Sequence, residues 1–294
     1  MIGTRLCEHL LAQGYSITGS DIRPNPWHRR IDDLTVIADL RRPSELEKLP
    51  TDIDRVVHLA ANARVYDLVL HPHLARDNFD MLFNTLEFCR QHTVSGFLFA
   101  SSREVYGNSD RQTNTEDEAM VWNCESPYAA SKYGGEALVN AYHHCYGINF
   151  IIFRLSNVFG MYDTSDRVIP LFIRQTLQNQ DIIVYGRGKC LDLSYIDDTV
   201  AGILSCIRKF PGVKNRTYNI ASGRSIPILD VARLIRDAMN GENAIITREN
   251  RKGEVMRSAV SISRAEKELC YAPRVSIEEG ILRTIAWYRD RGLI

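Results

Sequence analysis

Residues 99–107 read F-A-S-S-R-E-V-Y-G, and residues 126–136 read S-P-Y-A-A-S-K-Y-G-G-E. The first stretch ends an apolar run that predicts a buried parallel strand. The second predicts a helix, because its serine suits the N-cap position and its proline suits the first helical turn. Tyr128 and Lys132 are four residues apart and therefore share one face of that helix. Ser102 ends the predicted strand, where open α/β sheets bind their ligands.

These three side chains could together remove a proton from an alcohol. A phenol has a pKa of about 10 and is a poor base at neutral pH, but a nearby ammonium group lowers that pKa. A serine hydroxyl can bind the same substrate oxygen, so the sequence predicts alcohol oxidation with hydride transfer to a nicotinamide. A tyrosine and a lysine four residues apart are weak evidence by themselves. Tyr185 and Lys189 have the same spacing in Y-G-R-G-K, where the two glycines disfavour a helix.

The composition is typical of a globular protein whose 294 residues could form one large or two modest domains. A formal net charge of zero favours neither a nucleic acid nor a membrane as partner. No apolar run reaches the length of a membrane span, and the charged start M-I-G-T-R-L-C-E-H does not resemble a signal peptide.

The cysteines and histidines favour a cytoplasmic protein without a metal site. The seven cysteines are scattered and include no C-x-x-C pair, which suits reduced thiols in a cytoplasm. Two short clusters, at residues 71–73 and 143–145, contain histidine but lack a second ligand pair at metal spacing.

Strand patterns alternate with helical patterns in the first half of the chain, which predicts an α/β fold with a Rossmann-type, doubly wound parallel sheet. We expect strands at residues 16–20, 35–38, 55–59, 96–100 and 149–154, and helices at residues 4–13, 78–91 and 127–146. Further on we expect helices at residues 168–178, 198–209, 228–239 and 277–290, and a strand at 182–184. The sequence thus predicts an NAD-binding domain of residues 1–157. Residues 158–294 then form a smaller substrate-binding α/β cap, with some segments returning to the sheet.

The start of the chain departs from the pattern of a dinucleotide-binding fold. Such a fold opens with a strand and a glycine-rich turn before its first helix. Here a helical pattern begins almost at once, and only Gly3 corresponds to that turn. We therefore expect the first strand to be missing, with Met1 an internal methionine of a longer reading frame and a gap in the middle of the sheet.

Taken together, the motifs resemble the extended short-chain dehydrogenase/reductases, specifically the nucleotide-sugar epimerases and dehydratases of the UDP-glucose 4-epimerase kind. The likeness extends over nearly the whole chain. Besides the two opening stretches it includes S-D-I-R-P at 20–24, V-V-H-L-A-A at 56–61, R-L-S-N-V-F-G at 154–160, Y-I-D-D at 195–198, Y-N-I-A-S-G at 218–223 and R-K-G-E at 251–254. The resemblance implies an NAD-dependent enzyme that acts on a nucleotide-diphosphate sugar.

The resemblance also implies roles for individual residues. Tyr128 is the implied catalytic base, Lys132 lowers its pKa and binds the nicotinamide ribose, and Ser102 binds the sugar hydroxyl. The implied cofactor-binding residues are Gly3, Asp21, Asp39, Leu40, Leu59, Ala60, Ala61, Asn78, Lys132 and Leu155. The carboxylate of Asp21 favours NAD over NADP, because it repels a 2′-phosphate.

For the substrate, the resemblance implies contacts from Asn157 to the sugar nucleotide and from Arg251 to its diphosphate. The arginine that usually precedes the Y-x-x-D stretch is replaced by Leu191, and Arg187 or Lys189 could supply the lost phosphate contact. Plain structural roles remain possible at three positions: a turn for Asp21, a loop cap for Asn157 and a solvated basic surface for Arg251.

The two residues after Ser102 bear on the type of reaction. Related 4,6-dehydratases carry Asp-Glu there, uronate decarboxylases keep the Glu, and 4-epimerases need neither residue. This chain has Arg103 and Glu104. Arg103 stays protonated and is a poor acid, although it could bind a substrate carboxylate. Glu104 is a catalytic candidate, or it pairs with Arg103 or a helix.

We therefore predict 4-epimerisation through a transient 4-keto sugar. The alternatives are a 4,6-dehydratase or uronate decarboxylase that uses Glu104, and a catalytically impaired protein that only binds NAD or a nucleotide sugar. The resemblance also implies a homodimer, formed through a four-helix contact that includes residues 78–91 and 127–146.

Overall fold

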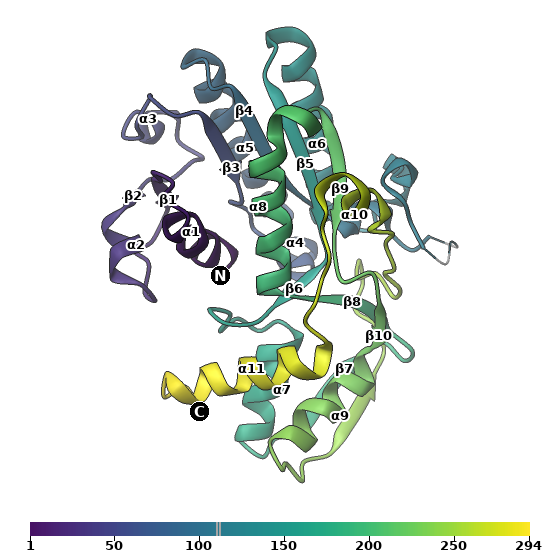
Figure 1. Cartoon of the computed structure of the whole chain (residues 1–294). Coiled ribbons are helices and arrows are strands. Elements are labelled where there is room, and N and C mark those ends of the chain that lie inside the picture. Colours follow the sequence, from purple (N-terminus) through teal and green to yellow (C-terminus); the bar gives the residue numbers. More distant parts are fainter. Residues whose placement is uncertain (110, 112) are drawn as a thin grey trace.

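The centre of the molecule is a four-stranded parallel sheet (Figure 1). The computed structural model describes residues 1–109, 111 and 113–294. The strands lie in the order β3 (Arg55–His58), β4 (Gly96–Ser102), β5 (Asn149–Leu155) and β9 (Arg216–Ile220). All seven residues of β4 are buried, as expected for an inner strand covered on both faces. The predicted α/β fold with a parallel sheet is confirmed.

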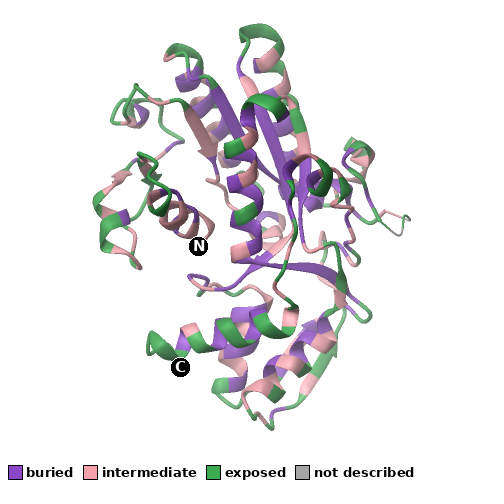
Figure 2. Cartoon of the chain, viewed as in Figure 1, coloured by how far each residue is buried: buried purple, intermediate pink, exposed green. Residues whose placement is uncertain are grey.

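Helices cover both faces of this sheet, and its two inner strands, β4 and β5, are almost entirely buried (Figures 1 and 2). One face carries α5 (His73–Gln91) and α6 (Pro127–Tyr146), and α8 (Ile196–Val213) covers the other. Helix α6 has the bounds expected from the sequence. Its N-cap, Ser126, accepts a hydrogen bond of 3.2 Å from the N–H of Ala129, and Gly147 ends it in the left-handed conformation.

The first strands of the chain form a separate sheet. The parallel pair β1 (Gly19–Asp21) and β2 (Thr35–Ile37) makes no ladder to the central sheet in the part of the chain that the structure describes. The leading element, α1 (Ile2–Ala12), packs against α8. The parallel strands of the first half are therefore divided between two sheets.

The second half of the chain builds a smaller lobe and also contributes to the central sheet. Its helices are α7 (Val168–Leu177), α9 (Ile228–Ala238) and α11 (Ile277–Asp290). Its strands are β6 (Asn157–Phe159), β8 (Cys190–Tyr195) and β10 (Ser225–Pro227) in one sheet, and the parallel pair β7 (Ile182–Tyr185) and β11 (Ile245–Arg248). Because β9 and α8 pack in the upper half, the last 137 residues are not confined to the lower lobe, where Figure 1 shows α7, α9 and α11.

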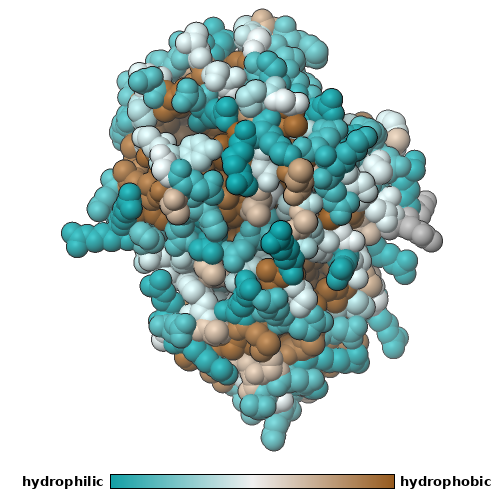
Figure 3. Space-filling model, viewed as in Figure 1, coloured by the Kyte–Doolittle hydropathy of each residue, from teal (hydrophilic) through white to brown (hydrophobic). Residues whose placement is uncertain are grey.

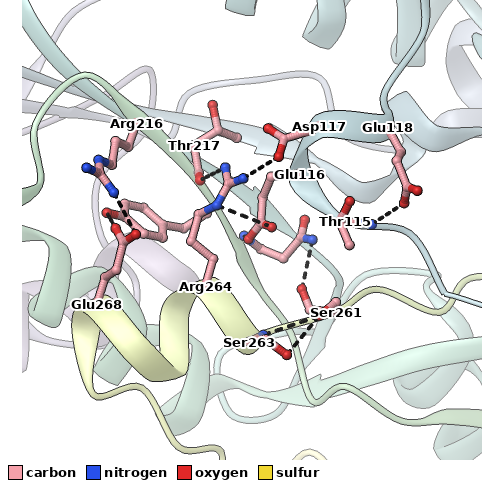
Figure 4. A network of polar contacts seen from close by, with 12 residues as sticks. Thr115, Glu116, Asp117, Glu118, Arg216, Thr217, Ser261, Ser263, Arg264 and Glu268 are labelled. Atoms are coloured by element: carbon pink, nitrogen blue, oxygen red, sulfur yellow. Dashed lines mark hydrogen bonds and ion pairs between the residues drawn. The ribbon is translucent and has the colours of Figure 1, made fainter.

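Short helices complete the fold, and a polar network fixes one of them to the central sheet. These elements are α2 (Arg29–Asp33), α3 (Pro43–Leu46), α4 (Val65–Leu70), α10 (Ser263–Leu269), η1 (Arg103–Tyr106), η2 (Glu116–Glu118) and η3 (Val121–Asn123). Arg264 of α10 donates to the carbonyl oxygen of Thr217 at 3.2 Å and to Asp117 at 2.6 Å (Figure 4). Glu116 accepts a 2.9 Å bond from the N–H of Asn219. The segment that precedes α6 is thus fastened to β9.

An aromatic contact joins the first part of the chain to the last. Trp27, in the loop after β1, lies edge-on to Trp287 of α11 with 5.2 Å between ring centroids. Tyr162 contacts both rings, at 6.0 Å and 5.5 Å. The remaining tryptophan, Trp122 of η3, is 77% exposed.

The surface mixes polar and apolar residues. On the face drawn in Figure 3, hydrophobic patches are interspersed with hydrophilic side chains. Among residues 1–109, 111 and 113–294, no helix combines the length and the apolar character that a bilayer crossing requires.

Candidate active site at the carboxyl ends of the parallel strands

The three residues expected to carry the chemistry lie on two adjacent elements. Ser102 ends β4, and α6 packs beside that strand and carries Tyr128 and Lys132. The helix comes close because Gly135 has no side chain: a Cβ there would lie 2.8 Å from the ring of Phe99. All three residues are buried, with exposed fractions of 8%, 7% and 4%. The structure therefore brings the predicted trio together.

Lys132 is held in place by β4. Its Nζ donates a 2.8 Å hydrogen bond to the carbonyl oxygen of Ala100 and lies 5.1 Å from the ring centroid of Phe99. The same atom is 5.9 Å from the ring centroid of Tyr128. The ammonium group of Lys132 is therefore fixed on the same side of α6 as the Tyr128 ring.

Burial dominates the ionisation of both side chains. It raises the pKa of Tyr128, and a hydrogen bond with Ser102 and the positive charge of Arg167 act against that rise. Burial lowers the pKa of Lys132 to about 8, and the carboxylate of Glu136 opposes this effect. Tyr128 therefore holds its proton more tightly here than a free phenol does, and positive charge nearby favours its release.

Arg103 and Glu104 form an ion pair directly after Ser102. Arg103 Nη2 lies 2.5 Å from Glu104 Oε1, and the two residues are only 6% and 4% exposed. The same Nη2 donates to Asn157 Oδ1 at 3.3 Å. Burial raises the pKa of Glu104, while the charge of Arg103 works against that rise. Each member keeps one buried polar atom, Nη1 of Arg103 and Oε2 of Glu104, without a hydrogen-bond partner among the described residues.

Most of the residues expected to bind the dinucleotide lie at or just after the carboxyl ends of β1, β2, β3 and β5, whereas Gly3 lies in α1. Asp21 is exposed at the end of β1, where its carboxylate is open to a ribose. Asp39 is paired with Arg41 at 2.8 Å, and Leu40 beside it is buried. Leu59, Ala60 and Ala61 follow β3 and are half-buried. A Cβ atom added to Gly3 would lie 3.9 Å from the side chain of Leu59. Leu155 is buried at the end of β5. An open carboxylate followed by small apolar residues fits an adenine dinucleotide.

Asn78 of α5 holds the segment that follows β3 through hydrogen bonds to Asn62. Its Oδ1 accepts a 2.7 Å bond from the N–H of Asn62, and its Nδ2 donates to the carbonyl oxygen of Asn62 and to Ser131 Oγ at 3.1 Å each. In this structure the side chain is therefore engaged in positioning the segment after Ala61 and joining it to α6.

The expected substrate residues do not all lie together. Asn157 begins β6 and donates to the carbonyl oxygen of Asp192 at 2.9 Å. Arg251 lines a cavity of about 60 Å³ with Lys189 and Tyr185, among other residues. Arg187 is exposed and does not line that cavity.

Lys189 lines the same cavity as Arg251. It is 8% exposed, and its Nζ donates to Glu254 at 2.6 Å and to Asn250 at 3.2 Å. As expected, Tyr185 and Lys189 do not share a helix, because Tyr185 ends β7 and Lys189 follows in the turn. Both residues nevertheless line the cavity that contains Arg251.

Two aromatic residues near this cavity have no role in the sequence-based prediction. The guanidinium carbon of Arg251 lies 4.0 Å from the ring centroid of Tyr185 and 5.0 Å from that of Tyr66. Tyr185 had one usable signal, its place at the end of a short apolar strand before a glycine. Tyr66 had none, since it belongs to α4 and meets Arg251 only through the fold.

A family model supports what the site suggests. The model described as the NAD dependent epimerase/dehydratase family matches residues 1–221. The chain belongs to this family. It is therefore an NAD-dependent enzyme of the extended short-chain dehydrogenase/reductase type, which confirms the resemblance and the expected cofactor.

Relatives of both reaction types match this family member over most of its length. The chain is 30% identical to an uncharacterized UDP-glucose epimerase, YtcB, of Bacillus subtilis over 302 residues, which is 97% of this chain and 94% of the relative. It is 33% identical to a dTDP-glucose 4,6-dehydratase of Streptomyces griseus over 238 residues, 80% of this chain and 71% of the relative.

Solved structures of the family share the fold. DesIV, a dTDP-glucose 4,6-dehydratase from Streptomyces venezuelae solved with NAD bound, superposes with a TM-score of 0.91 at 27% identity and covers 99% of this chain and 95% of its own. The UDP-glucose 4-epimerase of Thermus thermophilus in complex with NAD superposes with a TM-score of 0.89 at 25% identity, covering 98% and 96%. The choice between epimerase and dehydratase therefore rests on the site.

Proposed function

We propose that this enzyme epimerises a nucleotide-diphosphate sugar at C4 through a transient 4-keto sugar. NAD, when bound, supplies the acceptor for the hydride from C4. Tyr128 removes the proton of the C4 hydroxyl, Ser102 holds that oxygen, and Lys132 stabilises the phenolate. Asp21, Asp39 and the small residues after β3 hold the cofactor. Asn157, Lys189 and Arg251 hold the nucleotide and its diphosphate.

The observation that favours epimerisation is the ion pair of Arg103 and Glu104. Elimination of water from the keto sugar requires an acid that protonates the leaving hydroxyl. A guanidinium remains protonated at any working pH and does not serve as that acid. Epimerisation needs no such acid, because the keto sugar only turns and takes the hydride back on its other face.

One observation favours a second candidate, a 4,6-dehydratase or a uronate decarboxylase. Glu104 Oε2 has no hydrogen-bond partner among the described residues, and burial raises the pKa of its carboxyl group, which favours a role in proton exchange. Under this alternative Glu104 acts on C5 of the keto sugar, and the ion pair only positions it.

The mass of the product distinguishes these reactions. Purified enzyme is incubated with NAD and UDP-glucose, UDP-glucuronate or their dTDP counterparts, and the products are analysed by mass spectrometry and NMR. We expect a product of unchanged mass with inverted configuration at C4. A product lighter by one water or one carbon dioxide contradicts the proposal and supports the second candidate.

NAD binding tests the proposal at an earlier step. Calorimetry with NAD should show one site per chain, and Asp21→Ala should weaken the binding. If the chain with Asp21 intact binds a nucleotide sugar but no NAD, the hydride mechanism is wrong and the protein is a binding protein.

A further inference from the structure

The guanidinium group of Arg251 is placed by aromatic rings rather than by hydrogen bonds. Its central carbon lies 4.0 Å from the ring centroid of Tyr185 and 5.0 Å from that of Tyr66. Within the described residues its side chain makes no hydrogen bond, and its ion-pair contact with Glu254 is long, at 3.9 Å. That carboxylate instead accepts a 2.6 Å bond from Lys189. The side chain of Arg251 is 29% exposed and lines a cavity, so its N–H groups remain available to a ligand there.

Tyr66 reaches this arginine from the other half of the molecule. It belongs to α4, which comes shortly after the small residues that follow β3 and that we expect beside the cofactor. Two further contacts join α4 to the cap. Arg64 Nη1 lies 3.4 Å from Asp166 Oδ2, and a Cβ atom added to Gly253 would lie 2.7 Å from the side chain of Val69. The turn that carries the arginine therefore packs directly on α4, and the position of the Tyr66 ring is fixed.

A ring beside a guanidinium group suits the binding of a diphosphate. An aromatic face attracts the cation without occupying its hydrogen-bond donors, which stay free for phosphate oxygens. A free arginine side chain has many rotamers, and their loss on binding weakens affinity. A ring that orders Arg251 before the ligand arrives reduces this loss. The effect matters more here because Leu191 replaces an arginine that the family resemblance leads us to expect at the diphosphate.

We propose that Tyr66 is a positioning residue for the nucleotide diphosphate, because its ring holds the guanidinium group of Arg251 in place for the phosphate oxygens. This inference rests on the proposed function, which assigns Arg251 to the diphosphate. Tyr66 comes from the half that carries the cofactor residues and Arg251 from the cap, so the affinity for the nucleotide depends on a contact between the two halves.

The test separates the ring of Tyr66 from its hydroxyl group and from the packing of α4. Tyr66→Leu removes the ring, and Tyr66→Phe keeps it. Tyr15→Leu, at a tyrosine that is 37% exposed, is the matched control for the same substitution elsewhere. Arg251→Met, alone and combined with Tyr66→Leu, completes a double-mutant cycle. Calorimetry measures UDP binding to each enzyme saturated with NAD, and steady-state rates with UDP-glucose and dTDP-glucose give kcat and KM.

We expect Tyr66→Leu to weaken UDP binding about three- to tenfold, the range of a partly exposed cation–π contact. KM should rise by a similar factor while kcat changes less than about twofold, because binding is lost equally in the ground state and the transition state. Tyr66→Phe and Tyr15→Leu should retain the parental affinity. In the Arg251→Met background, Tyr66→Leu should weaken UDP binding no further, since the ring then has no guanidinium group to hold.

Two results overturn the inference: Tyr66→Leu binds UDP as tightly as the parent, or it weakens binding equally with and without Arg251. The second result would mean that the ring acts only through packing. If Arg251→Met itself keeps the parental affinity for UDP, Arg251 does not bind the diphosphate and the inference is wrong with it. Failure of the proposed function has a different signature, a parent enzyme that gives no C4 epimer from either nucleotide sugar, and the UDP-binding cycle still decides the role of Tyr66.

Discussion

Tyr128 can lose its hydroxyl with little disturbance to its surroundings, because its ring is already packed in a buried position. We expect Tyr128→Phe to lower turnover by about 10²–10⁴-fold, the usual contribution of a general base, while NAD binding persists. Steady-state rates and calorimetry measure the two effects. Tyr133→Phe is the control, since the Tyr133 hydroxyl donates to the carbonyl oxygen of Ala119 instead. If Tyr128→Phe keeps most of its turnover, Tyr128 is not the base.

Lys132 makes a prediction about stability and pH. Its pKa is lowered from 10.5 to about 8 by burial, so between these values the unfolded chain binds more protons than the folded one. Stability therefore rises with pH across this window, and below pH 8 the buried charge imposes its full penalty, on the order of 3 kcal/mol. Relief of this penalty should make Lys132→Met more stable than the parent at pH 7, although inactive.

The difference in the free energy of unfolding between Lys132→Met and the parent should shrink as the pH rises from 8 toward 10.5. Above that range the lysine of the parent is neutral in both the folded and the unfolded state. Urea unfolding of both proteins at a series of pH values measures it. A Lys132→Met enzyme that is less stable than the parent at pH 7 would show that the bond to Ala100 and the contact with Phe99 outweigh the burial penalty.

At this scale the sequence predicts a contact well only when few residues separate the partners or a strand end fixes their place. Tyr128 and Lys132 lie on one turn of a capped helix, and Ser102 ends a clearly apolar strand, so the proximity of these three residues could be predicted. Tyr66 stacks on Arg251 across 185 positions of the chain, and no local pattern in the sequence encodes that contact.

At the scale of elements, we propose that the turn after β7 supplies the phosphate contact that Leu191 does not. Lys189 is buried in the cavity beside Arg251, whereas Arg187 is exposed. We expect Lys189→Met to weaken UDP binding about tenfold, because a charge-assisted hydrogen bond to phosphate is worth about 1.5–3 kcal/mol. Arg187→Met is the matched control in the same turn. Calorimetry with UDP compares them, and equal loss in both variants would contradict this assignment.

Elements with clear end signals were predicted to within a few residues, and the others were not. Helix α6 has a serine N-cap, a proline in its first turn and a glycine after its end, and its bounds were predicted correctly. The strands β6, β8 and β10 have three to six residues each and pair across long stretches of chain. Their stability depends on partners brought close by the fold, so propensity alone does not reveal them.

At the scale of the whole molecule, α5 and α6 present apolar side chains to solvent. Phe83 of α5 is 48% exposed, Phe79 is 36% exposed, and Tyr146 at the end of α6 is 54% exposed. These residues support the proposal of a homodimer formed through the two helices. We expect Phe83→Asp to convert the dimer to a monomer in sedimentation velocity. Leu282→Asp, at a position 56% exposed on α11, should leave the dimer intact. Sedimentation of the parent as a monomer would contradict the proposal.

The strand order of the central sheet also belongs to this scale. The sequence predicts parallel strands with helices between them, but the joining of β9 to β5 depends on 60 intervening residues, 156–215, that build part of the cap. The same holds for the site, whose cofactor side comes from consecutive strand ends. The substrate side that we propose combines β6, the turn after β7 and residue 251, and only the folded chain brings these together.

The contact between Trp27 and Trp287 gives the molecule a built-in optical reporter. Two of its three tryptophans lie half-buried against each other across the first and last parts of the chain, and the third, Trp122, faces solvent. In a Trp122→Phe protein all indole emission comes from the pair. Separation of α11 from the loop after β1 would expose both rings to water and move the emission to longer wavelength. Fluorescence alone can thus follow the docking of the carboxyl-terminal helix without any attached label.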